Sequence, residues 1–137
     1  MQVTNPDIKI FIDFFHNAAQ KVRGEKPKFV HGKDGKLVKL ALTRISEQQL
    51  EQLALWFLEK KRALTTTIGA MLSGSVLQTL QDDMKSPNFW KELDAIYDSH
   101  YPRPDFAKEL LKKFKPFTDK QVAEIQEEVS RLERSKM

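Results

Sequence analysis

Positively charged side chains gather in one short stretch near the start of the chain, and this stretch is the one best suited to binding chemistry. It holds seven Lys or Arg residues opposed only by Glu25 and Asp34: Lys21, Arg23, Lys26, Lys28, Lys33, Lys36 and Lys39. Glycines at positions 24, 32 and 35 would let backbone N–H groups approach an anion. A helix beginning near Asp34 would add the positive end of its dipole. These features favour contact with phosphate groups.

Phe29 lies between two of these lysines and could stack on an unpaired base. The segment has little Arg and no obvious recognition helix, so it predicts phosphate contacts rather than reading of base edges. We therefore expect a nucleic acid, DNA rather than RNA, to bind at Lys26, Lys28, Phe29, Lys33, Lys36 and Lys39. The alternative is a solvated loop whose Phe29 is folded into the core.

Catalysis and metal binding find no support in residue types or spacing. The chain has no Cys, and its three His residues show no zinc-binding spacing. The adjacent carboxylates 82–83 and 127–128 would point about 100° apart on a helix, so neither pair converges on a common atom. Glycine-rich nucleotide-binding and nucleophile-elbow motifs are also missing from the sequence. We expect a protein that is not an enzyme and holds no metal or cofactor.

Two other features suggest a protein partner. Trp56 lies off the apolar stripe of Leu53 and Phe57, so it is expected at the surface, where an aromatic ring can anchor a partner. The last predicted helix carries a narrow, heptad-like apolar stripe made of Val122, Ile125, Val129 and Leu132. This helix is expected either to dock on its own domain or to bind a partner.

The composition describes a globular chain with an uneven charge. It has 137 residues, of which 40% are hydrophobic and 31% charged. Residues 1–45 carry nine Lys or Arg against four Asp or Glu, whereas residues 46–104 carry six against eight. No apolar run approaches the roughly 20 residues of a membrane span, and the N-terminus lacks the pattern of a signal peptide. We expect no membrane contact and a cytoplasmic location.

Apolar residues spaced by three and four predict an all-α fold, a compact bundle of about seven short helices with no substantial sheet. The first helix is expected to begin at Asn5 as its cap, and residues 24–36 to form a basic loop. Capping boxes are expected at Ser46 with Gln49 and at Thr118 with Gln121. The other helices fall near residues 37–45, 67–84, 86–97 and 106–114. These elements make a helical domain at 1–117 and a C-terminal amphipathic helix at 118–137.

Two glycines, Gly69 and Gly74, fall inside the helix predicted over residues 67–84. Each costs about 1 kcal/mol relative to Ala in a helix interior. We expect another backbone to approach them closely and offset this cost. That backbone could belong to this chain or to a second copy in a homo-oligomer.

The order of these features resembles a small helical module of phage and mobile-element proteins. It is similar to the accessory domain of some phage replication-initiation, or replisome-organiser, proteins and of related phage proteins. The resemblance covers about residues 8–80 and rests on GKDGK and TIG, that is Gly32, Lys33, Asp34, Gly35, Lys36, Lys39, Thr67, Ile68 and Gly69. No winged-helix DNA-binding domain precedes the module in this sequence. The resemblance therefore implies an accessory role.

These patterns together suggest a non-enzymatic accessory protein of a phage or mobile genetic element. It would bind DNA, or a nucleoprotein complex of replication, mainly through phosphate contacts of the basic loop. Two alternatives stay open. One is a protein–protein adaptor or inhibitor, such as a helicase loader or an anti-defence protein. The other is a small helical subunit of an RNA-guided effector complex.

Overall fold

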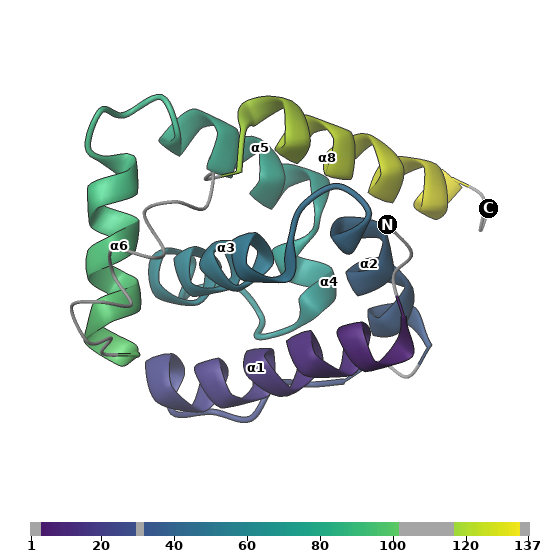
Figure 1. Cartoon of the computed structure of the whole chain (residues 1–137), viewed down its shortest axis with the longest axis horizontal. Coiled ribbons are helices and arrows are strands. Elements are labelled where there is room, and N and C mark those ends of the chain that lie inside the picture. The colour runs from purple at the N-terminus through teal and green to yellow at the C-terminus, as the bar shows by residue number, and fades with distance from the viewer. Residues whose placement is uncertain (1–3, 30–31, 102–116, 135–137) are drawn as a thin grey trace.

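The computed structural model describes residues 4–29, 32–101 and 117–134, and within these ranges the chain is all-α, as predicted. No strand occurs in the described residues. The helix predicted over residues 106–114 lies outside them. The helices, labelled as in Figure 1, are α1 (Asn5–Arg23), α2 (Lys33–Leu42), α3 (Glu47–Lys60), α4 (Ile68–Met71), α5 (Gly74–Asp83), α6 (Phe89–His100) and α8 (Asp119–Arg134).

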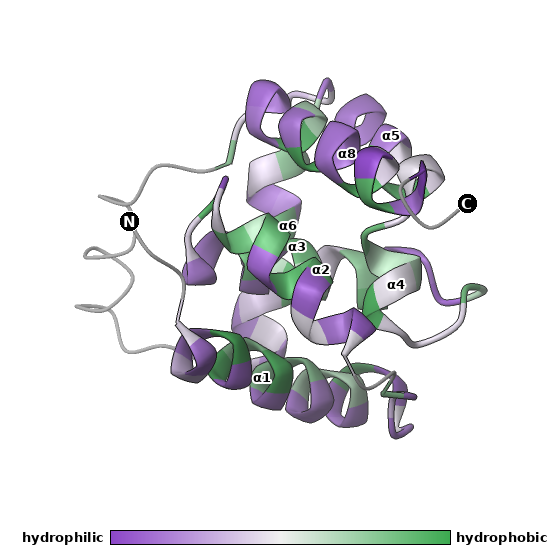
Figure 2. Cartoon of the chain, turned by 90° about the vertical axis from the view of Figure 1, so that its right-hand side faces the viewer, coloured by the Kyte–Doolittle hydropathy of each residue, from purple (hydrophilic) through white to green (hydrophobic). Residues whose placement is uncertain are grey.

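Helix α3 forms the centre of the bundle (Figure 1), and α1 and α6 both pack against it. Residues 53–58 of α3 are all buried, because a helix covered on every side needs apolar residues around its whole circumference. The hydropathy colouring of Figure 2 shows that α1, in contrast, is apolar on the side facing the bundle and hydrophilic on the other. None of the described helices is long and apolar enough to cross a membrane.

Trp56 does not lie at the surface, so the prediction of an exposed anchor at this position is wrong. Its side chain is only 2% exposed. Residues Phe89 and Leu93 of α6 border the same hollow as Trp56, which shows that α6 covers the side of α3 expected to face solvent. The indole Nε1 donates a hydrogen bond to Asp83 Oδ2 at 3.1 Å, so the polar atom of this buried ring is satisfied.

Side-chain caps determine where several helices begin. Both predicted capping boxes form, at Ser46 with Gln49 and at Thr118 with Gln121. The first helix begins at a cap one residue earlier than expected. Thr4, not Asn5, accepts from the Asp7 backbone N–H, and the Asp7 carboxylate accepts from the Thr4 backbone in return. Because Thr4 and Asp7 complete a reciprocal box, they satisfy two backbone donors where Asn5 would satisfy one.

The single helix predicted over residues 67–84 is divided into α4 and α5. Ser73 caps α5 by accepting from the Val76 N–H, while its hydroxyl donates to the Ala70 carbonyl at 2.8 Å. Gly74 therefore begins α5 rather than lying in a helix interior. A Cβ built on Gly69 or Gly74 would have a side-chain nitrogen as its nearest neighbour, about 4 Å away. No backbone of the described residues makes the predicted close approach, and the break removes the helix-interior cost at Gly74.

Helix α8 packs on α5 and α2. Its residues Val122, Ile125 and Val129 are buried in the same core cluster as α3. Leu132, at the end of the stripe, is partly buried against that cluster. This packing corrects the expectation that the stripe offers a surface to a partner, since the three buried side chains already contact the chain's own core.

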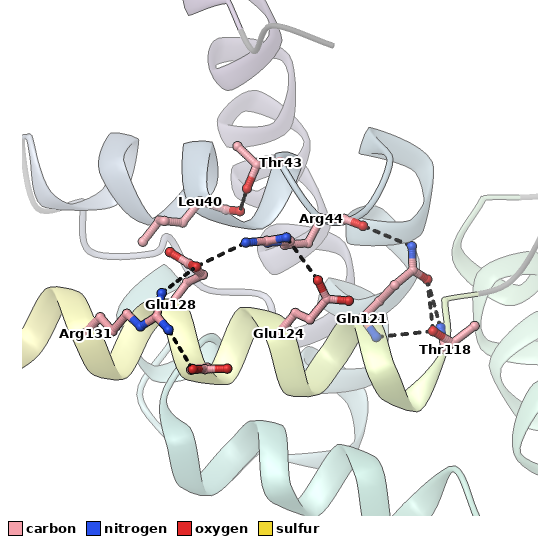
Figure 3. A network of polar contacts seen from close by, with 9 residues as sticks. Leu40, Thr43, Arg44, Thr118, Gln121, Glu124, Glu128 and Arg131 are labelled. Atoms are coloured by element: carbon pink, nitrogen blue, oxygen red, sulfur yellow. Dashed lines mark hydrogen bonds and ion pairs between the residues drawn. The ribbon is translucent and has the colours of Figure 1, made fainter.

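A polar network joins the start of α8 to the corner between α2 and α3 (Figure 3). The Arg44 guanidinium lies 3.0 Å from a Glu124 oxygen and 3.1 Å from a Glu128 oxygen. Gln121 Nε2 donates to the Arg44 carbonyl at 2.9 Å. Exposed ion pairs contribute little to stability by themselves, so the network orients α8 while the apolar stripe holds it.

Candidate nucleic-acid interface

The loop that follows α1 is anchored to the end of α3 by Arg23. Its guanidinium donates to the carbonyls of Phe57, Leu58, Lys61 and Leu64 and to the Thr66 hydroxyl, at 2.6–3.2 Å. These carbonyls include ones at the C-terminal end of α3 that lack a helical partner, and a cation suits the negative end of the dipole. Arg23 is therefore a structural residue, occupied by the protein itself.

Residues 24–29 lie beside the segment that links α3 to α4, and hydrogen bonds join the two. Gly24 takes the left-handed conformation (φ 66°) that ends α1, a conformation favoured by Gly. Beyond it, the Thr66 hydroxyl donates a hydrogen bond to the Glu25 carboxylate, and the Lys28 N–H donates to the Thr66 carbonyl at 3.3 Å. The loop is thus attached to the fold at both its first and its later residues.

Lys26 and Lys28 line a polar hollow of about 330 Å³ beside this attachment. Arg62 and Thr65, from the segment after α3, form its other wall, and Glu25 lies in it as well. Arg62 pairs with Glu59 at 2.9 Å. With Arg62 paired and Glu25 in the lining, Lys26 and Lys28 are the cations of the hollow that remain available to an anion.

Helix α2 presents its own lysines to solvent. It begins at Lys33, so the predicted loop over residues 24–36 ends earlier than expected. Gly32 forms the N-cap at φ 82° and makes no side-chain cap. Lys33, Lys36 and Lys39 are exposed, at successive intervals of three, while the opposite side of α2 is buried. The helix therefore displays a cationic face at its N-terminal end, where the dipole also favours an anion.

A groove of about 550 Å³ lies between α1 and α2. Ile8 and Ile12 of α1 and Phe29 of the loop give it apolar walls, and Lys36 and Lys39 line it from α2. Phe29 is 44% exposed, so it is not folded into the core, as one part of the alternative expected. The Phe29 ring meets the ring of His16 edge-on, with their centroids 6.3 Å apart.

Five lysines of this region share a lack of side-chain partners. Over residues 4–29, 32–101 and 117–134, no ion pair or side-chain hydrogen bond engages Lys26, Lys28, Lys33, Lys36 or Lys39. The other described Lys and Arg side chains contact a carboxylate, a carbonyl or an aromatic ring, except Lys91 and Lys120. Five unpaired cations in one segment leave a concentrated positive field for an external anion.

The structure separates the predicted contact residues into two groups. Lys26 and Lys28 share the polar hollow with Arg62, whereas Phe29, Lys36 and Lys39 share the groove with Lys9. Lys33, the first residue of α2, lines neither of them, and its Nζ lies 4.0 Å from the position of a Cβ on Gly69 of α4. Lys9 and Arg62 were missed by sequence reasoning. Lys9 lies near the opposite end of α1 from Lys21 and Arg23, and Arg62 follows α3, so only the packing of the helices brings them there.

A pair of carboxyl groups on α3 was also missed. Burial, together with the neighbouring Glu47 carboxylate, raises the pKa of Glu51 to about 8. The spacing of Glu47 and Glu51 at i, i+4 was the available signal, since it places both on one helical face. Burial, with Tyr97 and Glu51 nearby, raises the pKa of Tyr101 to about 12. Tyr101 donates its hydroxyl hydrogen bond to Asn17 Oδ1 at 2.6 Å.

The raised pKa of Glu51 predicts that the fold is more stable in mild acid than in mild base. The folded state holds the Glu51 proton more firmly than the unfolded state, so this contribution is complete below pH 4.5 and disappears as the pH rises through about 8. Discounted for solvent screening, the loss is on the order of 1 kcal/mol. Glu51→Gln should make the melting temperature less dependent on pH between pH 5 and 9. An unchanged pH profile in this variant would contradict the assignment.

Within the described ranges no group of three or more His, Asp and Glu side chains is arranged to hold a metal ion. Comparisons of the chain with protein-family models, with curated proteins and with solved structures gave no match.

Proposed function

We propose that this chain is a non-enzymatic nucleic-acid-binding protein that holds DNA, alone or within a nucleoprotein complex, through phosphate contacts. The observation that carries the proposal is the set of five exposed lysines without partners on the loop and α2. The resemblance of residues 8–80 to a phage replication module suggests an accessory protein of a phage or mobile genetic element. Lys26, Lys28, Lys33, Lys36 and Lys39 would each neutralise a phosphate.

The kinds of cation present argue for binding that is largely independent of base sequence. Arg is the residue that best reads base edges, because its planar fork pairs with two acceptors of guanine. In the basic segment the one Arg, Arg23, is already held by carbonyls at the end of α3. The lysines that remain act as flexible point charges, which suit phosphate oxygens.

The salt dependence of binding tests this proposal directly. Labelled single-stranded DNA, duplex DNA and RNA would be titrated with the protein at several salt concentrations. If five phosphates are neutralised, the slope of log K against log salt should be about −3.5 for a single strand and about −4.5 for a duplex. A flat response, or no binding near physiological salt, would exclude nucleic acid as the partner.

Charge reversal locates the contact surface. Lys33→Glu combined with Lys36→Glu should weaken DNA binding at least about 10-fold, because two phosphate contacts become repulsive. Acidic residues near the start of α2 suit the helix dipole, so the fold should be preserved.

The matched control is Lys91→Glu with Lys120→Glu, which changes the net charge equally at two other exposed lysines without partners. It should alter affinity by no more than about 2-fold, since only the long-range field changes. Equal losses in both double variants would mean that overall charge attracts DNA, not this surface. A variant that loses its cooperative thermal transition would show that Lys33 and Lys36 are structural.

A second candidate is an adaptor that binds a protein. The observation that favours it is a largely apolar hollow of about 450 Å³ between α2 and α8, lined by Leu40, Thr43 and Leu132. Lys39 and Arg131 border it, so an acidic and apolar segment would suit it. Leu40→Gln, which adds no charge beside Lys36 and Lys39, should abolish capture of such a partner and leave DNA affinity unchanged.

A further inference from the structure

The groove between α1 and α2 combines two properties that phosphate binding alone does not need. Its walls are apolar, formed by Ile8, Ile12 and the exposed ring of Phe29. Its volume of about 550 Å³ falls within the roughly 300–1,000 Å³ range typical of small-molecule sites. Lysines that only attract a polyanion need no apolar hollow beside them, because a flat polar surface would serve. The apolar walls of this groove therefore suggest an occupant that is itself apolar.

The charge at the rim of the groove is positive. Lys9 borders it from α1, and Lys36 and Lys39 border it from α2. Asp13 also lies at the rim and pairs with Lys9 at 3.4 Å, so the carboxylate offsets only one of the three cations. The occupant should therefore be an apolar, flat group attached to an anionic backbone.

We propose that this groove accepts an unpaired base of a single-stranded nucleic acid, with the base against Phe29 and the adjoining phosphates on Lys36 and Lys39. This inference rests on the proposed function and makes it specific, since it predicts that single strands are preferred to duplexes. In a duplex the faces of the bases are stacked on one another, and only an unpaired base can offer its face to an aromatic side chain.

The position of Phe29 between the two lysine groups favours a nucleic acid over an acidic peptide. Lys26 and Lys28 line the polar hollow on one side of the anchored loop, and Lys36 and Lys39 line the groove that contains Phe29. A strand with one charge in every nucleotide can meet both groups of lysines while one base enters the groove. An acidic helix lying in the groove would leave Lys26 and Lys28 without a partner.

The test compares three probes of equal length: an oligothymidylate, the same backbone with abasic sites, and a duplex. The abasic strand keeps every phosphate and removes every base. Wild-type protein should bind the oligothymidylate about 10-fold more strongly than the abasic strand, which is the range of one stacked base. Affinity for the duplex, compared at the same salt concentration, should also be lower than for the oligothymidylate.

Phe29→Ala should lower affinity for the oligothymidylate to that for the abasic strand, while the salt dependence stays unchanged. Phe29→Trp should keep the preference, and its fluorescence should be quenched by the bound base. Ile10→Ala is the matched control, because Ile10 is an exposed apolar residue of α1 that does not line the groove. It should leave all three affinities unchanged.

The outcomes separate this inference from the proposed function. Equal affinity of the wild type for the oligothymidylate and the abasic strand, with a steep salt dependence, overturns the base site and leaves phosphate binding intact. No binding of any probe overturns both. This comparison needs only the wild-type protein, so it decides the matter even if the Phe29 variants fail to fold. An acidic helical peptide whose binding is lost in Phe29→Ala, when the nucleic-acid probes show no dependence on Phe29, would likewise overturn the base site.

Discussion

Aspartate in place of Ile125 should destabilise the protein by about 4 kcal/mol or more. Ile125 is fully buried between α8 and the helices beneath it. The substitution removes a large apolar side chain and places a carboxylate in the apolar core. Denaturant unfolding would show a lower midpoint, and limited proteolysis would cleave near α8 first if the helix detaches before the remaining bundle unfolds.

The matched control is Ala123→Asp on the exposed side of the same helix. It introduces the same carboxylate, and the same weaker helix propensity, at an exposed position. The free energy of unfolding should therefore fall by no more than about 0.7 kcal/mol. If Ile125→Asp behaves like this control, α8 is a detachable arm and its apolar stripe regains its role as a candidate partner surface. A large difference means that α8 belongs to the folding unit.

Replacing Arg23 by alanine should cost about 3 kcal/mol, a fall of roughly 10 °C in the melting temperature. Five hydrogen bonds from one guanidinium join the end of α1 to the end of α3 and the segment after it. Their removal leaves helix-end carbonyls without a donor and detaches the loop. Charged hydrogen bonds contribute more than neutral ones, but those of one side chain do not add fully.

Two further variants separate geometry from charge. Arg23→Lys keeps the cation but cannot reach five acceptors, so its melting temperature should fall between those of the wild type and Arg23→Ala. Lys26→Ala removes a positive charge from the same loop at an exposed position without a partner, and should change stability by less than about 0.5 kcal/mol. Equal stability of Arg23→Ala and Lys26→Ala would contradict the structural role of Arg23.

Local features of this fold could be predicted from the sequence. The helices over the described residues follow from apolar spacing, and the Ser46 and Thr118 boxes depend only on residues three positions apart. Their determinants are close neighbours along the chain, so the sequence contains most of the necessary information. The division between α4 and α5 was missed although it is also local, because Ser73 and Gly74 fit a helical pattern as small residues.

Long-range features could not be predicted in this way. Trp56 is buried because α6 covers it from another part of the chain, a contact to which its position on α3 gives no clue. Arg23 differs from its lysine neighbours because its acceptors lie 34 to 43 residues away. Lys9 joins Lys36 and Lys39 only after α1 and α2 pack side by side. The basic segment was visible in the sequence, but its division into structural and unpaired cations was not.

The attachment of residues 24–29 to the end of α3 has a kinetic consequence. Arg23 and the contacts of Thr66 hold the loop in place before any ligand arrives. Because Lys26, Lys28 and Phe29 then stand on a backbone that is already ordered, association needs no folding step and loses little conformational entropy. If the proposed function holds, encounter with a polyanion is governed by diffusion and by the positive field, and its rate should rise as the ionic strength falls.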